Sequence, residues 1–329
     1  MYLNSQSFEP SNHIRESAWL EHSPFVFWLV DTLRPSKMVE LGTHNGFSFL
    51  SQCQVAKAIG LDTVIYAIDT WEGDEHAGFY TSEIYDNLEA EVRIQYPGIG
   101  RLIRSTFATA RSEFEDGSVD LLHIDGRHRY DDVKEDFQTW VSCLSNKGIV
   151  LFHDTCVRHN DFGVYRYWQE VSRKYPSFEF YHGNGLGLII VGKDAPGSIK
   201  NLCLESFENK SFIRHAYSKL GYINSIQFKL MSEISIRKKI SSSINIKDNE
   251  LKISSNKIHD MDNKISHLNA KIENDERIHN QQIIQMRNET EQLKSDLRAM
   301  QISKDDILSS TSWKITYPLR AIKSFFSRW

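Results

Sequence analysis

Residues 222–317 contain neither proline nor glycine, so no helix-breaking residue interrupts this long stretch. Apolar side chains recur there every seven residues: nine of ten positions counted from Ile244 are apolar, and their neighbours are mostly Lys, Asp, Glu, Asn and Ser. A narrow apolar stripe of this period is best buried against another helix. We therefore predict a coiled coil over residues 241–308 that makes the chain self-associate, with a single solvated amphipathic helix as the alternative. The ten positions are Ile244, Leu251, Ile258, Ile265, Ile272, His279, Met286, Leu293, Met300 and Ile307.

The first part of the chain has a different character. Short β-rich runs alternate with helical stretches, which is typical of an α/β domain with a mostly parallel sheet. We expect this domain over residues 1–195 and a helical connector over residues 196–240. The expected strands are Lys37–Leu41, Thr63–Asp69, Arg101–Ser105, Val119–Asp125 and Gly148–His153, with a closing hairpin of Phe178–Tyr181 and Leu186–Gly192. The expected helices are Ser17–Leu33, Phe47–Ile59, Tyr85–Gln95, Tyr130–Cys143 and Val164–Lys174.

The composition of the chain limits the cellular compartments and the classes of partner that we expect for it. Its formal net charge is -4, which is not the profile of a nucleic-acid-binding protein. The four cysteines are scattered without metal-type spacing, as expected in a reducing cytoplasm. The sequence shows no signal peptide and no apolar run of the ~18 residues that a membrane span needs. We therefore expect a cytoplasmic protein.

A glycine-rich turn follows the first expected strand. In the sequence VELGTHNGFS, Glu40 lies near the end of the strand, and Gly42 and Gly46 bracket a tight turn into a helix. Glycine permits positive φ and a close approach of the backbone to a ligand, and a helix N-terminus offers free N–H groups. The turn, which includes Thr43 and Asn45, is therefore a candidate nucleotide-binding turn, with a purely structural turn as the alternative.

The second expected strand also ends on an acid, Asp69. A carboxylate at this place can accept hydrogen bonds from both hydroxyls of a ribose. Trp71 is a candidate to lie against an adenine, and covering the edge of the sheet is its alternative role. The turn before it lacks the three glycines of a nicotinamide-binding fingerprint, which counts against a dehydrogenase.

Two further acids, Asp125 and Asp154, end the fourth and fifth expected strands. The carboxyl ends of neighbouring parallel strands line one crevice, so we expect these carboxylates to converge and to suit a hard cation such as Mg²⁺. His153 is an additional candidate ligand that suits Mn²⁺ or Fe²⁺ better. His128, three residues after Asp125, is a candidate catalytic base, and a structural hydrogen-bonded histidine is the alternative.

Together these motifs resemble the class I S-adenosylmethionine-dependent methyltransferases. Within that class, residues 15–193 are similar to the O-methyltransferases grouped with macrocin O-methyltransferase and the cephalosporin-hydroxylase-like proteins, a likeness to which residues 68–80 and 182–187 add. The resemblance implies a Rossmann-like α/β fold with helices on both faces of the sheet, and S-adenosylmethionine as the cofactor. The residues that we accordingly assign to cofactor binding are Glu40, Gly42, Thr43, Asn45, Gly46, Asp69, Trp71 and Asp125.

The acids at 125 and 154 also resemble the metal site of catechol-type O-methyltransferases. In those enzymes acids at the same two strand ends hold the ion beside an asparagine, whose place Thr155 takes here. The resemblance implies a divalent cation on Asp125, Asp154 and Thr155, although the change from asparagine leaves the third ligand open. His128 stands where the catechol enzymes carry a catalytic lysine, and we expect it to act in catalysis together with Asp125.

The last residues, 309–329, combine Lys and Arg with Trp, Tyr and Phe, and no acid follows Asp306. This composition suits the membrane–water interface, with packing on the coil or on a partner protein as the alternative. Residues 310–320 resemble tails of bacterial polysaccharide-assembly enzymes. We therefore expect an O-methyltransferase for a sugar hydroxyl of a bacterial surface polysaccharide or its lipid-linked precursor, peripheral at the inner face of the membrane. The alternatives are an O-methyltransferase of a small secondary metabolite and an inactive coiled-coil scaffold in glycan assembly.

Overall fold

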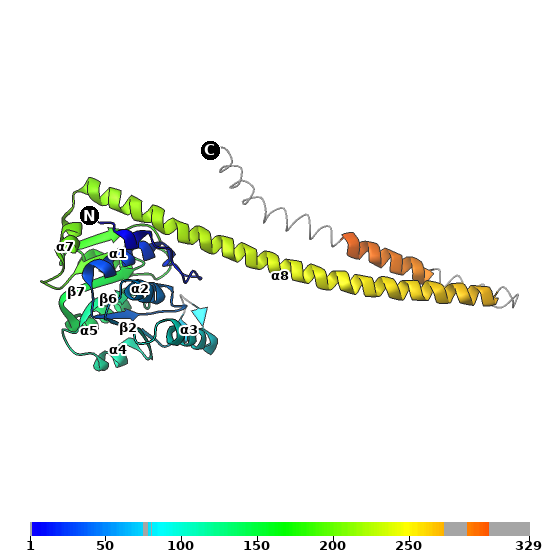
Figure 1. Ribbon diagram of the computed structural model, residues 1–329, viewed down its shortest axis with the longest axis horizontal. Helices are drawn as coiled ribbons and strands as arrows, with labels where there is room; N and C mark the ends of the chain where they lie inside the picture. Colours follow the sequence, from blue (N-terminus) through cyan, green and yellow to red (C-terminus); the bar gives the residue numbers. More distant parts are fainter. Residues whose placement is uncertain (1, 75–77, 80, 273–287, 303–329) are drawn as a thin grey trace. The chain divides into compact units, whose positions relative to one another are not determined.

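The computed structural model describes residues 2–74, 78–79, 81–272 and 288–302 (Figure 1). The strands are β1 (Lys37–Leu41), β2 (Val64–Asp69), β3 (Gly73–Asp74), β4 (Gly78–Phe79), β5 (Gly100–Arg104), β6 (Val119–Ile124), β7 (Leu144–His153), β8 (Ser177–Phe180) and β9 (Leu186–Ile190). The α-helices are α1 (Ser23–Leu33), α2 (Phe47–Ala58), α3 (Ser82–Gln95), α4 (Phe107–Ala110), α5 (Tyr130–Trp140), α6 (Val164–Val171), α7 (Gly197–Leu204) and α8 (Phe207–Ile272). Short 3-10 turns are η1 (Ser5–Phe8), η2 (Leu20–His22), η3 (Arg111–Glu113) and η4 (Val141–Cys143).

Seven strands form one sheet in the order β5–β2–β1–β6–β7–β9–β8. The first five are parallel, whereas β9 runs antiparallel to β7 and β8 runs antiparallel to β9. This confirms the expected Rossmann-like sheet closed by a hairpin. The chain enters at β1, moves outward to β5 and returns on the other side at β6, so the strand order reverses between β1 and β6. Ligands of open parallel sheets bind at the carboxyl ends of the strands beside such a reversal.

Helices cover both faces of the sheet, because successive residues of a strand point to opposite sides. In β1, Met38 packs into a core shared with α1, α2 and the first turns of α8. Val39 and Leu41 pack into the opposite core, which contains side chains from α4, α5 and α6. β6 is buried along its whole length, as expected for a central parallel strand.

The first helix begins later than the sequence indicated. It starts at Ser23 and not at Ser17, because Pro24 suits the first turn of a helix and has no N–H to donate further inside one. Residues 16–19 consequently belong to no helix or strand. β7 begins at Leu144, earlier than expected, and its first residue pairs with Val119 of β6.

The helix α8 begins within the expected connector. The first compact unit extends through Leu230, beyond the expected boundary at residue 195, and Ile213 and Tyr217 of α8 are buried in its core. The second unit, residues 231–329, contains the rest of α8 and the helical residues 288–302. A continuous helix over much of the expected coiled coil is thus confirmed, and its pairing with another helix stays a prediction.

The expected basic tail at 309–329 lies outside the described residues. Across the described helices, none combines the length and the hydropathy that crossing a membrane requires.

Candidate active site

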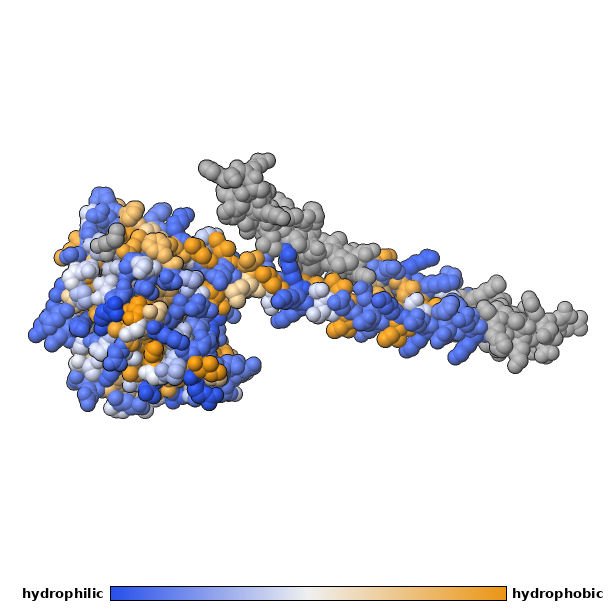
Figure 2. All heavy atoms as spheres, in the orientation of Figure 1, coloured by the Kyte–Doolittle hydropathy of each residue, from blue (hydrophilic) through white to orange (hydrophobic). Residues whose placement is uncertain are grey.

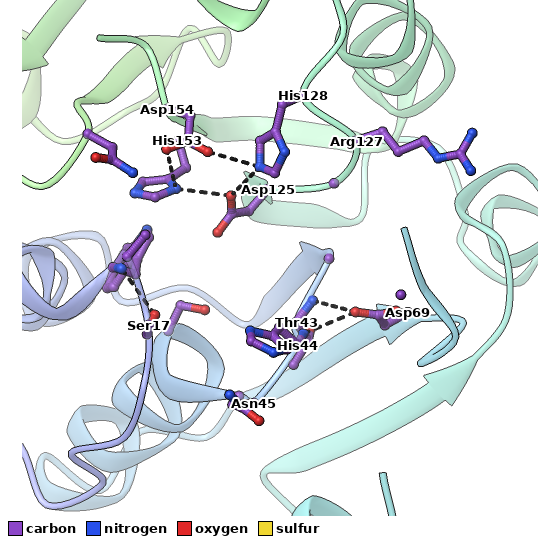
Figure 3. Close-up of a pocket in the computed structure, with 18 of the residues that line it drawn as sticks. Ser17, Thr43, His44, Asn45, Asp69, Asp125, Arg127, His128, His153 and Asp154 are labelled. Carbon is purple, nitrogen blue, oxygen red and sulfur yellow. Dashed lines mark hydrogen bonds and ion pairs between the residues drawn. The ribbon is translucent and has the colours of Figure 1, made fainter. Parts of the chain in front are cut away.

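A cavity of about 890 Å³ lies at the carboxyl ends of the parallel strands, beside the reversal between β1 and β6. Its volume is in the range of pockets that hold small molecules and cofactors. Figure 3 shows two groups of side chains that face each other across it, one from the ends of β6 and β7 and the other from the turns after β1 and β2. Six of the eight residues predicted to bind the cofactor line the cavity: Gly42, Thr43, Asn45, Gly46, Asp69 and Asp125.

The two glycines of the turn after β1 are required by close packing. Gly42 has a φ of +87°, and a Cβ there would lie 2.1 Å from the carbonyl oxygen of Asp125. Gly46 has a φ of +83° at the N-terminus of α2, where a Cβ would lie 2.6 Å from Leu88. Both glycines therefore have a structural role in addition to their place in the cavity wall.

The carboxylate of Asp69 fixes the same turn. Its Oδ2 accepts hydrogen bonds from the backbone N–H groups of Thr43 (2.8 Å) and His44 (3.1 Å). Its Oδ1 accepts one from the N–H of Trp71 (2.8 Å). A carboxylate offers about four lone-pair positions, so acceptor capacity remains for the hydroxyls of a ligand.

Glu40 supports the turn from behind and does not line the cavity. It is completely buried, and its carboxylate accepts hydrogen bonds from Thr43 Oγ1 (3.1 Å), Gln52 Nε2 (2.9 Å) and His123 Nδ1 (2.8 Å). Because neighbouring side chains already occupy the carboxylate, this arrangement favours a supporting role for Glu40 over the predicted direct contact with the cofactor.

Trp71 and Thr155 also lie outside the cavity lining, in contrast to their predicted roles. Trp71 is 1% exposed, packs edge-to-face on Tyr85 and donates its indole N–H to the carbonyl of His44 (3.2 Å). These contacts favour its alternative role as a cover for the sheet edge. Thr155, the residue after Asp154, is completely buried and does not line the cavity.

The predicted convergence of Asp125 and Asp154 is present, with His128 between them (Figure 3). Nε2 of His128 lies 2.9 Å from Oδ2 of Asp154 and 3.7 Å from Oδ1 of Asp125. His153 joins from β7, with Nδ1 3.0 Å from Oδ1 of Asp125 and Nε2 3.2 Å from the carbonyl oxygen of Gly183. We call Asp125, His128, Asp154 and His153 the acid–histidine cluster.

Asp154 has the backbone conformation of a strained functional position. Its φ is +59°, a left-handed value that aspartate tolerates better than most residues. The turn follows directly after β7, and Asp154 there faces His128 while being only 4% exposed. Backbone strain of this kind persists only where surrounding contacts hold it, which is common at ligand sites.

Charge pairing governs protonation in the cluster. Burial lowers the pKa of His128, but hydrogen bonds and charges of Asp125 and Asp154 outweigh it and raise the pKa to about 10. Burial likewise lowers the pKa of His153, yet the same two carboxylates raise it to about 9. His128 therefore keeps its proton at neutral pH in this arrangement, and it can act as a base only if something else displaces that proton.

The cluster has the donor set for a divalent cation. Asp125, His128 and Asp154 each place one ligand atom within 4.8 Å of the others. Oδ1 of the buried Asp154 has His153 Nδ1 at 3.4 Å as an ion-pair contact and accepts no hydrogen bond. Two carboxylates and an imidazole fit a transition-metal ion such as Mn²⁺ better than Mg²⁺, which prefers oxygen ligands throughout. The residues thus fit a cation in which His128 takes the place that the sequence analysis gave to Thr155.

Comparison with known proteins connects this geometry to one family. Residues 39–155, which run from β1 to the end of the cluster, match the sequence model of a family described as a methyltransferase domain. This part of the chain is therefore similar to a methyltransferase domain.

Similarity also extends to a longer protein of the curated collection. The chain is 50% identical over 192 residues to an uncharacterized protein, y4gI, of Sinorhizobium fredii; the match covers 58% of this chain and 21% of that protein. The chain therefore spans about a fifth of the length of this relative.

Two solved structures are more distant. The O-methyltransferase TomG of Streptomyces achromogenes, involved in tomaymycin synthesis and solved with S-adenosylmethionine, is 13% identical with a TM-score of 0.40, covering 58% of this chain and 97% of TomG. The methyltransferase PaMTH1 of Podospora anserina, solved with S-adenosylhomocysteine, is 16% identical with a TM-score of 0.38, covering 51% of this chain and 77% of that one.

Several residues that line the cavity were not predicted from the sequence. Thr106 and Phe107 follow β5, so the rule that placed Asp69 and Asp125 at strand ends would have found them. Phe228, which comes from α8, was missed as well. No local pattern marks this position, because it reaches the cavity through long-range packing.

The compact unit of residues 1–230 should lose stability as pH rises from the pKa of Asp136 in the unfolded chain to its higher pKa in the folded chain. Burial, followed by the charges of Asp132 and Glu135, raises the pKa of Asp136 to about 7 from an ordinary value of 3.8. Between those values the unfolded chain releases this proton and the folded chain keeps it, so folding is progressively disfavoured. We expect Asp136→Asn to stabilise the protein at pH 8 by on the order of 1–3 kcal/mol and to change little at pH 4.

Urea unfolding of both proteins at the two pH values measures the difference. The matched control is Glu135→Gln, which removes one neighbouring charge from an exposed position and should stabilise less. Equal stability of Asp136→Asn and wild type at pH 8 would contradict the assignment.

Proposed function

We propose that this protein is an S-adenosylmethionine-dependent O-methyltransferase assisted by a divalent cation. The main support for this proposal is a single cavity that has the glycine-rich turn and Asp69 on one side and the acid–histidine cluster on the other. The turn, Asp69, Asp125, His128 and Asp154 all lie within the residues that match a methyltransferase family. A methyl donor and a hydroxyl acceptor must meet in such a site with little freedom, since alignment supplies much of the rate acceleration.

The two sides of the cavity have different tasks in this proposal. Gly42, Thr43 and Asn45 line the cavity and would border the part of the cofactor that carries the sulfonium, and Asp69 would accept hydrogen bonds from the ribose hydroxyls. S-adenosylmethionine supplies an activated methyl group, so the protein needs only to orient the acceptor and favour loss of its hydroxyl proton. Asp125, His128 and Asp154 would hold the cation, which lowers the pKa of a bound hydroxyl.

The acceptor that we propose is a sugar hydroxyl of a bacterial surface polysaccharide or its lipid-linked precursor. A cation held by two carboxylates suits neighbouring hydroxyls, which sugars present. The aromatic ring of Phe162, which stacks on His128, borders the same cavity and provides an apolar surface beside the cluster for a sugar ring. A small secondary metabolite with neighbouring hydroxyls is the alternative within the same chemistry, whereas an inactive scaffold would not need the converging cluster.

Calorimetry on the full chain tests the function without knowledge of the acceptor. We expect S-adenosylhomocysteine and S-adenosylmethionine to bind, and Mn²⁺ to bind the cofactor complex more tightly than Mg²⁺ because of the His128 ligand. Absence of binding by both adenosyl compounds would refute the methyltransferase proposal. Cofactor binding without any cation binding would leave a methyltransferase that works without a metal.

Self-association through α8 is the second part of the proposal. Figure 2 shows apolar side chains along the visible face of α8, and Ile244, Leu251 and Ile258 are less exposed than the residues on either side of them. We expect the double variant Leu251→Asn, Ile258→Asn to lower the oligomeric state measured by light scattering, because both positions lie on the heptad stripe.

The matched control is Ile246→Asn, Ile253→Asn, which makes comparable changes two residues after the stripe positions Ile244 and Leu251, at side chains that are 60% and 56% exposed. This control should remain oligomeric. A wild-type chain that is monomeric at micromolar concentration would contradict the coiled coil.

We further propose that residues 309–329 bind the inner face of a membrane. Basic and aromatic side chains suit anionic interfaces, and several linked tails would gain avidity. Full-length protein should therefore sediment with vesicles that contain anionic lipid, and a variant without residues 310–329 should not. Equal sedimentation of the two proteins would refute membrane binding by the tail.

A further inference from the structure

Residues 16–20 form one wall of the cavity. Glu16, Ser17, Ala18, Trp19 and Leu20 all line it. This segment precedes α1, and its regular structure is limited to the 3-10 turn that begins at Leu20. It also lies outside residues 39–155, the part that matches the methyltransferase family. A segment without hydrogen-bond ladders of its own needs contacts from other elements to hold its shape.

The first turns of α8 supply contacts of this kind. Asn224 is only 5% exposed, and its Nδ2 lies 2.9 Å from the carbonyl oxygen of Leu20 and 2.8 Å from Oγ of Ser23. Ser225 donates its hydroxyl to Oε1 of Glu21 at 2.9 Å. The amide of Asn224 therefore ties the end of the wall to the start of α1.

Close backbone contact reinforces this attachment. A Cβ on Gly221 would lie 2.0 Å from the carbonyl oxygen of Glu21, so α8 approaches the wall as closely as a glycine permits. Phe228, one turn after Asn224, lines the cavity itself while packing partly buried against the core. Residues 221–228 thus touch both the back of the wall and the cavity.

The wall also contacts the glycine-rich turn. Nδ2 of Asn45 donates a hydrogen bond to the carbonyl oxygen of Glu16 at 3.3 Å. Arg15, the residue before Glu16, donates a hydrogen bond from Nη1 to the carbonyl oxygen of Asn45 at 2.9 Å. The segment is therefore fixed at one end to the turn after β1 and at the other end to α8.

We propose that the beginning of α8 is part of the cofactor site, with Gly221 and Asn224 as positioning residues for the wall and Phe228 as a residue of the wall itself. The inference rests on the proposed S-adenosylmethionine site, because the wall adjoins the turn that would hold that cofactor. Under this proposal the beginning of the long helix belongs to the methyltransferase unit, and residues 1–195 alone would lack part of the site.

The test uses full-length variants and S-adenosylhomocysteine as the probe. We expect Asn224→Ala and Phe228→Ala each to weaken binding about tenfold. The first variant loses a buried hydrogen bond and the second loses a well-packed ring. We expect Gly221→Ala to weaken it at least as much, although alanine by itself favours a helix over glycine. Dissociation rates from stopped-flow fluorescence should rise in parallel.

Two variants of the same helix serve as matched controls. Asn209→Ala removes an exposed amide that bonds Glu205, and Phe212→Ala removes a ring that is 71% exposed. Both should bind the probe like wild type. Affinities are compared at 10 °C together with melting temperatures, because a general loss of stability would lower the melting temperature and leave low-temperature affinity unchanged.

The outcomes separate the two proposals. If the wild-type chain does not bind S-adenosylhomocysteine, the proposed function fails. If wild type binds and Asn224→Ala and Phe228→Ala bind equally well, the function stands and the role of α8 in the site is overturned. Where the added Cβ of Gly221→Ala prevents folding, Ser225→Ala takes its place in this comparison, as a milder change that removes the hydrogen bond to Oε1 of Glu21.

Discussion

Replacing Asp69 by alanine should weaken binding of S-adenosylhomocysteine by roughly 1.5–3 kcal/mol, which is about 10–150-fold. The carboxylate would lose its hydrogen bonds with the ribose hydroxyls. It would also release the backbone N–H groups of Thr43, His44 and Trp71, which it holds at 2.8–3.1 Å. Ligand contact and turn geometry would therefore be lost together, which places the effect towards the upper end of that range.

A graded series makes this prediction sharper. Asp69→Asn keeps one acceptor oxygen and should lose less affinity than Asp69→Ala. Asp62→Ala makes the same change at an exposed position before β2 and should bind like wild type. Calorimetry on folded full-length proteins measures all three. Unchanged affinity of Asp69→Ala would remove the cofactor from this side of the cavity.

Replacing Asp154 by asparagine should weaken Mn²⁺ binding by on the order of 10²–10³-fold while S-adenosylhomocysteine still binds. The substitution keeps the size of the side chain but removes the negative charge that faces His128 at 2.9 Å. In this variant only Asp125 and His128 would hold the cation. A single carboxylate would then balance its charge poorly in a buried site.

Electron paramagnetic resonance of Mn²⁺ measures the free ion directly and so reports this loss. Asp194→Asn provides the control, because its exposed carboxylate lies outside the cavity. Retention of wild-type Mn²⁺ affinity by Asp154→Asn would show that the ion binds elsewhere, and catalysis would then have to proceed without a cation in the acid–histidine cluster.

The sequence alone determined the parts of the site that depend on short-range pattern. Asp69, Asp125 and Asp154 were found because each follows a recognisable buried strand, and parallel strands bring their carboxyl ends to one edge. The turn with Gly42 and Gly46 was found because positive φ favours glycine. The long helix was predicted because nothing in its sequence interrupts a helical stretch.

Only the tertiary structure decided which side chains face the cavity. Glu40, Trp71 and Thr155 lie within predicted motifs but are buried behind the lining, because neighbouring packing sets the direction of each side chain. His128 lies between two carboxylates, which raise its pKa. It therefore carries a proton at neutral pH or binds a metal, whereas the sequence predicted a free base.

The wall at residues 16–20 and its attachment to α8 could not be predicted at all. Asn224 and Leu20 are 204 residues apart, and their hydrogen bond forms only when α8 packs on the domain. Gly221 looks like a weak point of a helix in the sequence, whereas in the fold it permits the close approach to Glu21. Local patterns carry no information about such contacts, because their free energy arises from surfaces that the folded chain alone brings together.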